Sequence, residues 1–138
     1  MMEMIREVHG DQRGLVGKLI IVWLLLAALI AVAAVDTVSI TLSRFKLSDT
    51  ATEAASDGAV DFRKSHDVTA ACSAAATTVQ TLQPEVKLGK NFCHVDPGTG
   101  YVTITLHATA RTVLAGRLEF SKKYATVTQS ETNGPSEV

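Results

Sequence analysis

Aromatic residues are scarce in this 138-residue sequence, at 5%, and neither sign of charge is in clear excess. A domain with so few aromatic side chains buries a thin core, so we expect part of its stability to come from a disulfide, a membrane or a partner. Thirteen Lys and Arg residues stand against fourteen Asp and Glu residues. The charges are therefore balanced, and we find no basic patch that would argue for nucleic-acid binding.

Motifs for catalysis and for cofactor or metal binding are also missing. The sequence has no phosphate-binding loop and no Gly-rich dinucleotide motif. His66, His94 and His107 have no ligand-like spacing with the two cysteines. Ser65 and Asp67 flank His66, but catalytic triads are assembled in space rather than from sequence neighbours, and helix capping explains these residues more simply. We therefore expect no enzyme activity, no cofactor, no metal site and no small-molecule substrate.

An apolar run occupies residues 19–35, which are seventeen consecutive Leu, Ile, Val, Ala or Trp residues. As a helix this run would be about 25 Å long, slightly short of the roughly 30 Å hydrocarbon core of a bilayer. Lys18 can extend its ammonium group toward the headgroups, and the residues after Asp36 keep a pattern that a helix can carry. The run therefore predicts one membrane-spanning helix.

This helix divides the chain into four parts. We expect a cytoplasmic tail or leader at residues 1–14, the transmembrane helix and its extension at 15–45, an extracytoplasmic domain at 46–129 and a flexible tail at 130–138. Arg6, Arg13 and Lys18 precede the apolar run, whereas Arg44 and Lys46 follow it closely. By the positive-inside rule this distribution weakly favours a cytoplasmic amino terminus. The expected localisation is therefore the cell membrane, crossed once.

A cleaved secretory signal is the main alternative for the same run. Basic residues precede it, and Ala31, Val32 and Ala33 form a small-x-small cleavage pattern. However, the run is longer than the apolar region of about 7–15 residues that a signal peptide has, and helical patterning continues past the cut. We favour an uncleaved anchor, and a secreted or anchored extracytoplasmic binding module remains the alternative.

The two cysteines, Cys72 and Cys93, both follow the apolar run. A bridge closing a loop of this size would contribute roughly 3 kcal/mol by restricting the unfolded chain. Such bridges persist in oxidising compartments, which agrees with an extracytoplasmic domain. Two unrelated, small buried residues are the other interpretation.

Beyond the run, a stripe of mostly small residues falls at helical spacing between residues 38 and 63. Small side chains let another backbone approach closely, so this stripe predicts a helix-packing face. The partner helix could belong to the same chain, which the sequence alone favours, or to another subunit. The face consists of Leu47, Ala51, Ala54, Ala55, Gly58, Ala59 and Phe62.

A partner helix is expected at residues 68–83, after a bend at 64–67, with Asp67 as its amino-terminal cap and Pro84 as its stop. Residues 101–110 then alternate between apolar and polar, which predicts a strand. A weaker strand is expected within residues 86–95, and turn residues at 96–100 join the two. Residues 112–120 suggest a short helical turn, and 124–129 a third strand. The predicted fold class is α+β: a long amino-terminal helix continuing into a helical hairpin, packed on a small antiparallel sheet of about three strands.

Residues 36–59 resemble the amino-terminal signature of TadE- and TadG-like proteins. These are pilin-like, single-span proteins of the tight-adherence (Flp) pilus machinery. The similarity lies in Asp36 at the end of the span, in Arg44, and in the alanines and glycine of the packing face. Arg13 and Gly14 resemble the family's usual opening, which makes Gly14 a candidate processing site.

The resemblance implies a pilin-like structural or accessory subunit, with the membrane and other pilus-assembly subunits, or further copies of itself, as partners. Family members have a glutamate five residues after the processing glycine. Here that residue is Leu19. The resemblance therefore leaves open whether the chain is a filament subunit or an accessory anchor.

Overall fold

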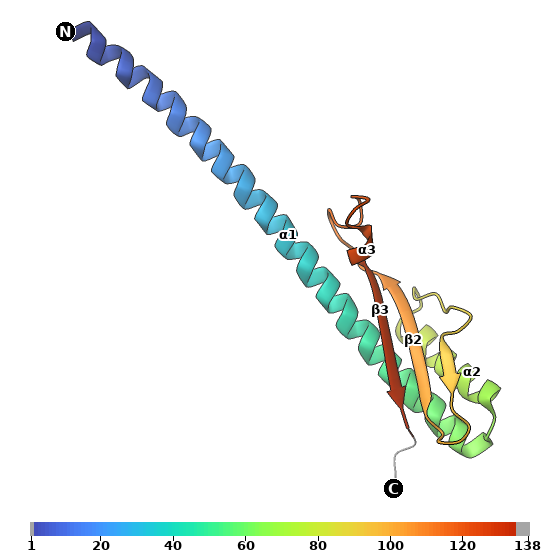
Figure 1. The fold of residues 1–138 in the computed structure, drawn as a ribbon. Helices are drawn as coiled ribbons and strands as arrows, with labels where there is room; N and C mark the ends of the chain where they lie inside the picture. The colour runs from blue at the N-terminus through green and yellow to red at the C-terminus, as the bar shows by residue number, and fades with distance from the viewer. Residues whose placement is uncertain (1, 135–138) are drawn as a thin grey trace.

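The protein is built along one helix of 64 residues, α1 (Met2–Ser65). The structure, a computed structural model, describes the backbone of residues 2–134 and the side chains of residues 14–134. At a rise of about 1.5 Å per residue, α1 is about 96 Å long. Figure 1 shows it as a single rod, with the rest of the chain gathered along its carboxy-terminal half. The predicted long amino-terminal helix is confirmed, and it begins at Met2 rather than near residue 15, since neither Gly14 nor Gly17 interrupts it.

The second helix, α2 (Val68–Leu82), folds back against α1 and completes the predicted helical hairpin. His66 makes the bend with a positive φ of 53°. The Oδ1 atom of Asp67 accepts the backbone N–H of Thr69 at 2.8 Å, which satisfies a donor that the helix start leaves unpaired. Asp67 is therefore the cap that the sequence predicts.

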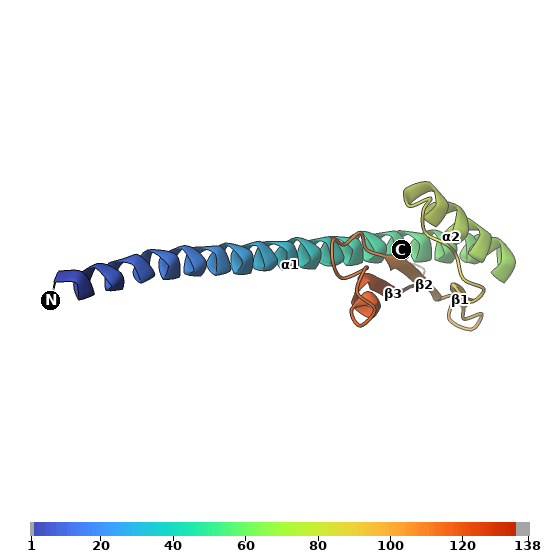
Figure 2. The same cartoon turned by 90° about the horizontal axis from the view of Figure 1, so that it is seen from above.

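Three antiparallel strands form a sheet in the order β1-β2-β3, which confirms the α+β fold class. They are β1 (Cys93–Val95), β2 (Val102–Thr109) and β3 (Thr126–Asn133), and a short helix, α3 (Lys122–Ala125), precedes β3. Viewed from above, the sheet and α2 lie on different sides of the α1 axis (Figure 2). Val102, Ile104 and Leu106 alternate along β2 and are buried in the core.

The third strand, predicted at 124–129, begins at Thr126 because residues 124 and 125 belong to α3, and it continues to Asn133. The composition of Ser130–Asn133 predicts the opening of a flexible tail, but these residues pair with residues 102–105 of β2. The hydroxyl of Thr132 lies 2.8 Å from that of Thr103, and the hydroxyl of Ser130 lies 3.0 Å from that of Thr105. Cross-strand hydrogen bonds therefore hold a polar segment whose composition resembles a tail. Residues 135–138 lie outside the described residues.

Of two further segments, one differs from its prediction and one agrees with it. Within residues 86–95 only the last three form a strand, since Val86 is buried through loop packing rather than strand pairing. Residues 112–120 contain the predicted short helical turn, because the Leu114 carbonyl accepts the backbone N–H groups of Arg117 at 2.9 Å and of Leu118 at 3.2 Å. A further helical turn follows at α3. The connection between β2 and β3 is therefore a long loop, residues 110–121, followed by α3, which leads back into the sheet.

Side-chain hydrogen bonds connect the outer domain to several positions along α1. The Nε2 atom of Gln83 donates to the Lys46 carbonyl at 2.8 Å and to the Thr50 hydroxyl at 2.6 Å. Between these two residues of α1, the Ser48 hydroxyl donates to Glu131 of β3 at 2.7 Å. The carboxy-terminal half of α1 is therefore an integral part of the domain.

Candidate functional site

The amino-terminal part of α1 is apolar and exposed. From Leu19 to Val35, the large hydrophobic side chains other than Val32 are roughly half to two thirds exposed, Trp23 at 64%. We call this segment, residues 14–35, the uncovered half of α1. It contains a stretch with a mean hydropathy of 2.8, and by length and composition α1 is able to span a membrane.

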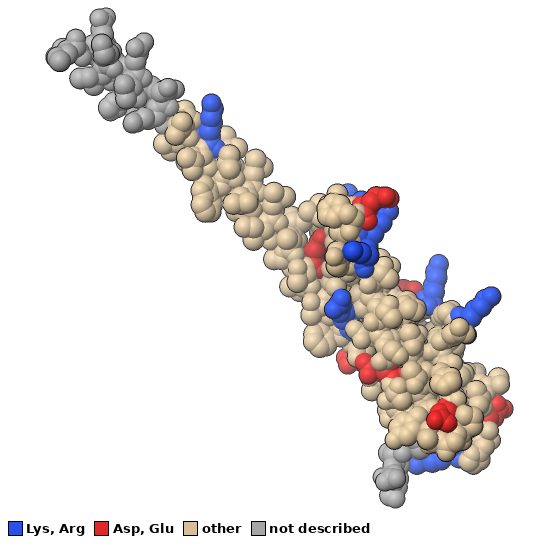
Figure 3. All heavy atoms as spheres, in the orientation of Figure 1, with Lys and Arg blue, Asp and Glu red and all other residues tan. Residues whose placement is uncertain are grey.

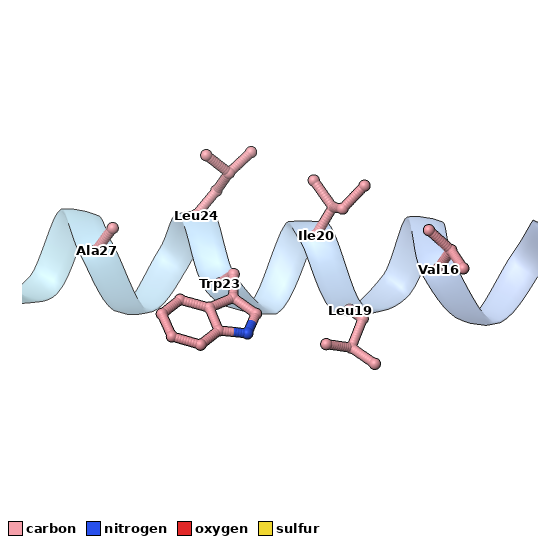
Figure 4. Close-up of a pocket in the computed structure, with 6 residues that line it drawn as sticks. All are labelled: Val16, Leu19, Ile20, Trp23, Leu24 and Ala27. Atoms are coloured by element: carbon pink, nitrogen blue, oxygen red, sulfur yellow. The ribbon is translucent and has the colours of Figure 1, made fainter.

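Figure 4 shows part of this surface as a shallow groove between side chains of α1 itself. All of its lining residues come from one face of the one helix, at helical spacing, and no other element approaches it in the described part of the chain. A surface of this kind is suited to lipid acyl chains or to a second apolar helix. The lining residues are Val16, Leu19, Ile20, Trp23, Leu24 and Ala27.

Asp36 marks the boundary between the uncovered half and the packed half of α1. Its side chain is buried, and its carboxylate accepts three backbone N–H groups, from Val113 at 2.6 Å, Leu114 at 2.9 Å and Ala115 at 2.9 Å. The Ser39 hydroxyl, one turn along α1, donates to the Arg111 carbonyl. Two residues of α1 therefore fix the start of the β2–β3 connection at the end of the apolar run.

Sequence reasoning did not find this contact. The only signal was a carboxylate placed directly after seventeen apolar residues. Burying an ionised carboxylate is costly unless donors surround it, so the residue implied partners, but nothing local identified them. The donors lie 77 to 79 residues away along the chain.

The predicted helix-packing face is buried inside the chain. Six of its seven residues are at most 6% exposed, and the seventh, Gly58, is buried as well. A Cβ atom at Gly58 would lie 3.1 Å from Val102, 3.2 Å from the Ala71 carbonyl oxygen and 3.5 Å from the Ala75 Cβ. The stripe thus packs against α2 and β2 of its own chain, and it is not available to another subunit in this fold. The other six residues are Leu47, Ala51, Ala54, Ala55, Ala59 and Phe62.

The cysteines form the predicted disulfide. Cys72 on α2 is bonded to Cys93 at the start of β1, with their Cα atoms 5.8 Å apart. The bridge connects the helical hairpin to the edge strand of the sheet, so it links the two layers of the outer domain. A bond of this kind is typical of oxidising compartments.

The outward face of the sheet is polar. Besides the two hydroxyl pairs between β2 and β3, the Nδ1 atom of His107 lies 2.8 Å from the Thr128 hydroxyl. These groups satisfy one another across the strands, so they do not converge on an empty position. In the described part of the chain, no group of three or more His, Cys, Asp or Glu residues could hold a metal ion.

The hairpin between β1 and β2 is closed by Asp96. Its Oδ1 atom accepts the Gly98 N–H at 2.9 Å, and this bond, with help from the Thr99 hydroxyl, holds the pKa of the Asp96 carboxyl below its ordinary value of 3.8. The predicted turn at 96–100 is therefore present, with the carboxylate as its internal acceptor.

Gly14 lies within α1, and among the described residues nothing beyond the adjacent backbone of α1 comes within 4 Å of a Cβ placed on it. An open position of this kind is compatible with access by a peptidase, and processing at Gly14 stays a prediction. Comparisons of the chain with protein-family models, with curated proteins and with solved structures found no match.

Proposed function

We propose that this chain is a membrane-anchored, pilin-like structural or accessory subunit of a tight-adherence type pilus or related envelope assembly. One observation carries the proposal. The apolar, uncovered half of α1 and the buried half are one unbroken helix, so a membrane anchor would be rigidly continuous with the core of the outer domain. The likeness of residues 36–59 to TadE- and TadG-like proteins supports the particular assembly.

The proposed orientation places the amino terminus in the cytoplasm and the domain outside. The Cys72–Cys93 disulfide supports this orientation, since disulfides persist in oxidising compartments. The basic residues before the apolar run agree with it.

Contacts between subunits would then involve the uncovered half of α1. The small-residue face is already occupied by α2 and β2, so it offers nothing to a neighbour. Helices in a membrane associate through close packing rather than through a hydrophobic driving force. Ala27, Ala31 and Ala34 provide small positions at which a second helix could approach.

Cysteine crosslinking in native membranes tests this proposal. Single cysteines would replace successive residues from Leu24 to Ile30, and the membranes would be oxidised before electrophoresis. Both native cysteines are already bonded to each other, so the background should be low. We expect crosslinked products, to itself or to another pilus subunit, at positions that recur with a period of about 3.6 residues. Absence of products at every position would contradict an assembly through this helix.

The mass of the mature protein separates the proposal from its alternative. An intact chain supports the uncleaved anchor, and loss of residues through Gly14 supports processing of a pilin type. Loss through Ala33 or Ala34 would instead support the secreted binding module. The secreted module is compatible with the fold, because cleavage after Ala33 or Ala34 would leave Asp36 and all of its hydrogen-bond partners in the mature chain.

A further inference from the structure

The connection from β2 to β3 lies beside the end of the apolar run. The three hydrogen bonds to Asp36 fix residues 113–115 at that level of α1. If residues 19–35 cross a bilayer, Asp36 lies at the outer boundary of the hydrocarbon core, and so does the segment that it holds. The contacts therefore fix the level of residues 113–115 along α1.

The segment 111–125 has the composition of a membrane-interface element. Its large apolar side chains are exposed, with Phe120 76% exposed and Tyr124 59% exposed, whereas Ala125 at its end is buried in the core. Amphipathic aromatic side chains are enriched at the level of lipid headgroups. The exposed apolar residues of the segment are Val113, Leu114, Leu118, Phe120 and Tyr124.

The same segment is basic. It contains Arg111, Arg117, Lys122 and Lys123 against the single carboxylate of Glu119, which gives a net charge of +3 from four cations and one anion. Figure 3 shows Lys and Arg side chains gathered at the end of the outer domain that faces the uncovered half of α1. Basic side chains at this level are attracted to anionic lipid headgroups.

We propose that segment 111–125 docks on the outer surface of the membrane, with Phe120 and Leu118 inserted at headgroup level and the four basic residues on the phosphates of anionic phospholipids. The inference rests on the proposed membrane anchor and deepens it. The helix alone would let the domain tilt and rotate about its entry point, whereas a second lipid contact beside the helix fixes the orientation of the domain. Tethering by α1 makes this second contact intramolecular, so a modest affinity is sufficient.

Fluorescence quenching by brominated lipids tests the docking, with the full chain reconstituted in vesicles of phosphatidylcholine and phosphatidylglycerol. Trp23 is the single tryptophan, so Trp23→Phe provides a silent background into which Phe120→Trp is introduced. The high exposure of Phe120 means that the exchange should not disturb folding. We expect the introduced indole to be quenched by lipids brominated near the headgroup.

The matched control is Tyr101→Trp in the same background. Val102 packs beside Gly58, and Gly58 lies 22 residues, or about 33 Å, beyond Asp36 along α1. Tyr101 directly precedes Val102, so a tryptophan at position 101 lies about that far along α1 from the expected membrane surface. The docking predicts quenching several-fold stronger at position 120 than at position 101. Equal, weak quenching at both positions would overturn it, as expected for a segment that binds another protein instead of lipid.

Two further measurements separate the parts of the proposal. In the wild-type chain, lipids brominated deep in the acyl chains should quench Trp23. Quenching of Trp23 without quenching at position 120 would overturn the docking and leave the anchor standing, whereas no quenching of Trp23 would contradict the anchor itself. The triple change Arg117→Gln, Lys122→Gln and Lys123→Gln should reduce quenching at position 120 several-fold in vesicles that contain phosphatidylglycerol. Unchanged quenching would overturn the role of anionic headgroups.

Discussion

The carboxylate of Asp36 accepts the backbone N–H of Val113 at 2.6 Å, across 77 residues of chain. This contact joins the last turn of the apolar run to the connection between β2 and β3. The carboxylate also accepts the N–H groups of Leu114 and Ala115, so three donors stabilise its negative charge. Asp36 lies where the uncovered half of α1 ends and the packed half begins. Asp36 therefore sets the height of segment 111–125 along α1.

Replacing Asp36 should release this segment. Asp36→Ala removes all three hydrogen bonds. Asp36→Asn replaces one acceptor oxygen by an NH₂ group, which cannot accept a hydrogen bond from the backbone N–H groups that it faces. We expect both variants to be cut by trypsin several-fold faster at the basic residues of the segment, Asp36→Ala the faster of the two. Timed digestion of the detergent-solubilised chain, followed by mass spectrometry, measures this.

The control for that experiment is Asp49→Asn. Asp49 lies on the same helix and is not buried, so its loss should leave the cleavage rate at Arg117, Lys122 and Lys123 unchanged. If the Asp36 variants were cut at the rate of Asp49→Asn, the carboxylate would not be what holds the segment.

Reduction of the Cys72–Cys93 bond should destabilise the outer domain. The bond closes a loop with a sequence separation of 21 residues, and restriction of the unfolded chain by a loop of this size contributes about 3 kcal/mol. Thermal melts with and without a phosphine reductant should differ by several degrees or more. The double variant Cys72→Ala and Cys93→Ala should have the melting temperature of the reduced protein, and the reductant should not change it. If this variant melted at the temperature of the oxidised wild type, the bond would add no stability.

The elements that the sequence predicts well are those with strong local patterns. The apolar run, the capped helix after Asp67 and the alternation along β2 are all readable within a window of about ten to twenty residues. The two cysteines, both beyond the run, made a disulfide one of two interpretations, and the structure shows that they are bonded. These features were enough to obtain the α+β class and the order of the elements.

The missed features depend on partners that are distant in sequence. Ser130–Asn133 look like a tail because their side chains are polar, and only the pairing with β2 makes them a strand. The donors to Asp36 come from backbone N–H groups, whose positions leave no signature in residue type. The stripe around Gly58 is correctly predicted as a packing surface, but its partner could not be chosen, since small residues serve contacts within a chain and between chains equally well.

Enlarging Gly58 should disrupt the packing of α1 on α2 and β2. A Cβ atom alone would come within 3.1 Å of Val102 and 3.2 Å of the Ala71 carbonyl oxygen, and a leucine side chain needs far more room. We expect Gly58→Leu to lower the free energy of unfolding by about 1–3 kcal/mol or more, the range typical of overpacked cores. Denaturant titration of the protein in detergent measures this change.

A matched glycine is available on the same helix. At Gly17 nothing lies within 4 Å of the position that a Cβ atom would take, so Gly17→Leu adds the same side chain without a collision. It should leave the unfolding of the outer domain unchanged. Equal effects of the two substitutions would mean that the loss of stability comes from the leucine side chain itself rather than from the tight contact at Gly58.

The hairpin at Asp96 should make a pH-dependent contribution to stability. The pKa of its carboxyl is lowered in the folded protein, chiefly by the Gly98 N–H, so the stabilisation is fully present above the ordinary pKa of 3.8 and is lost as the pH falls through the folded pKa. Asp96→Asn keeps an acceptor oxygen but removes the charge. We therefore expect the wild type to melt above Asp96→Asn at neutral pH and the difference to shrink below pH 3.8. Glu53→Gln, at an exposed position on α1, serves as the control. If the difference in melting temperature between the wild type and Asp96→Asn stayed constant with pH, folding would not favour the ionised form of Asp96.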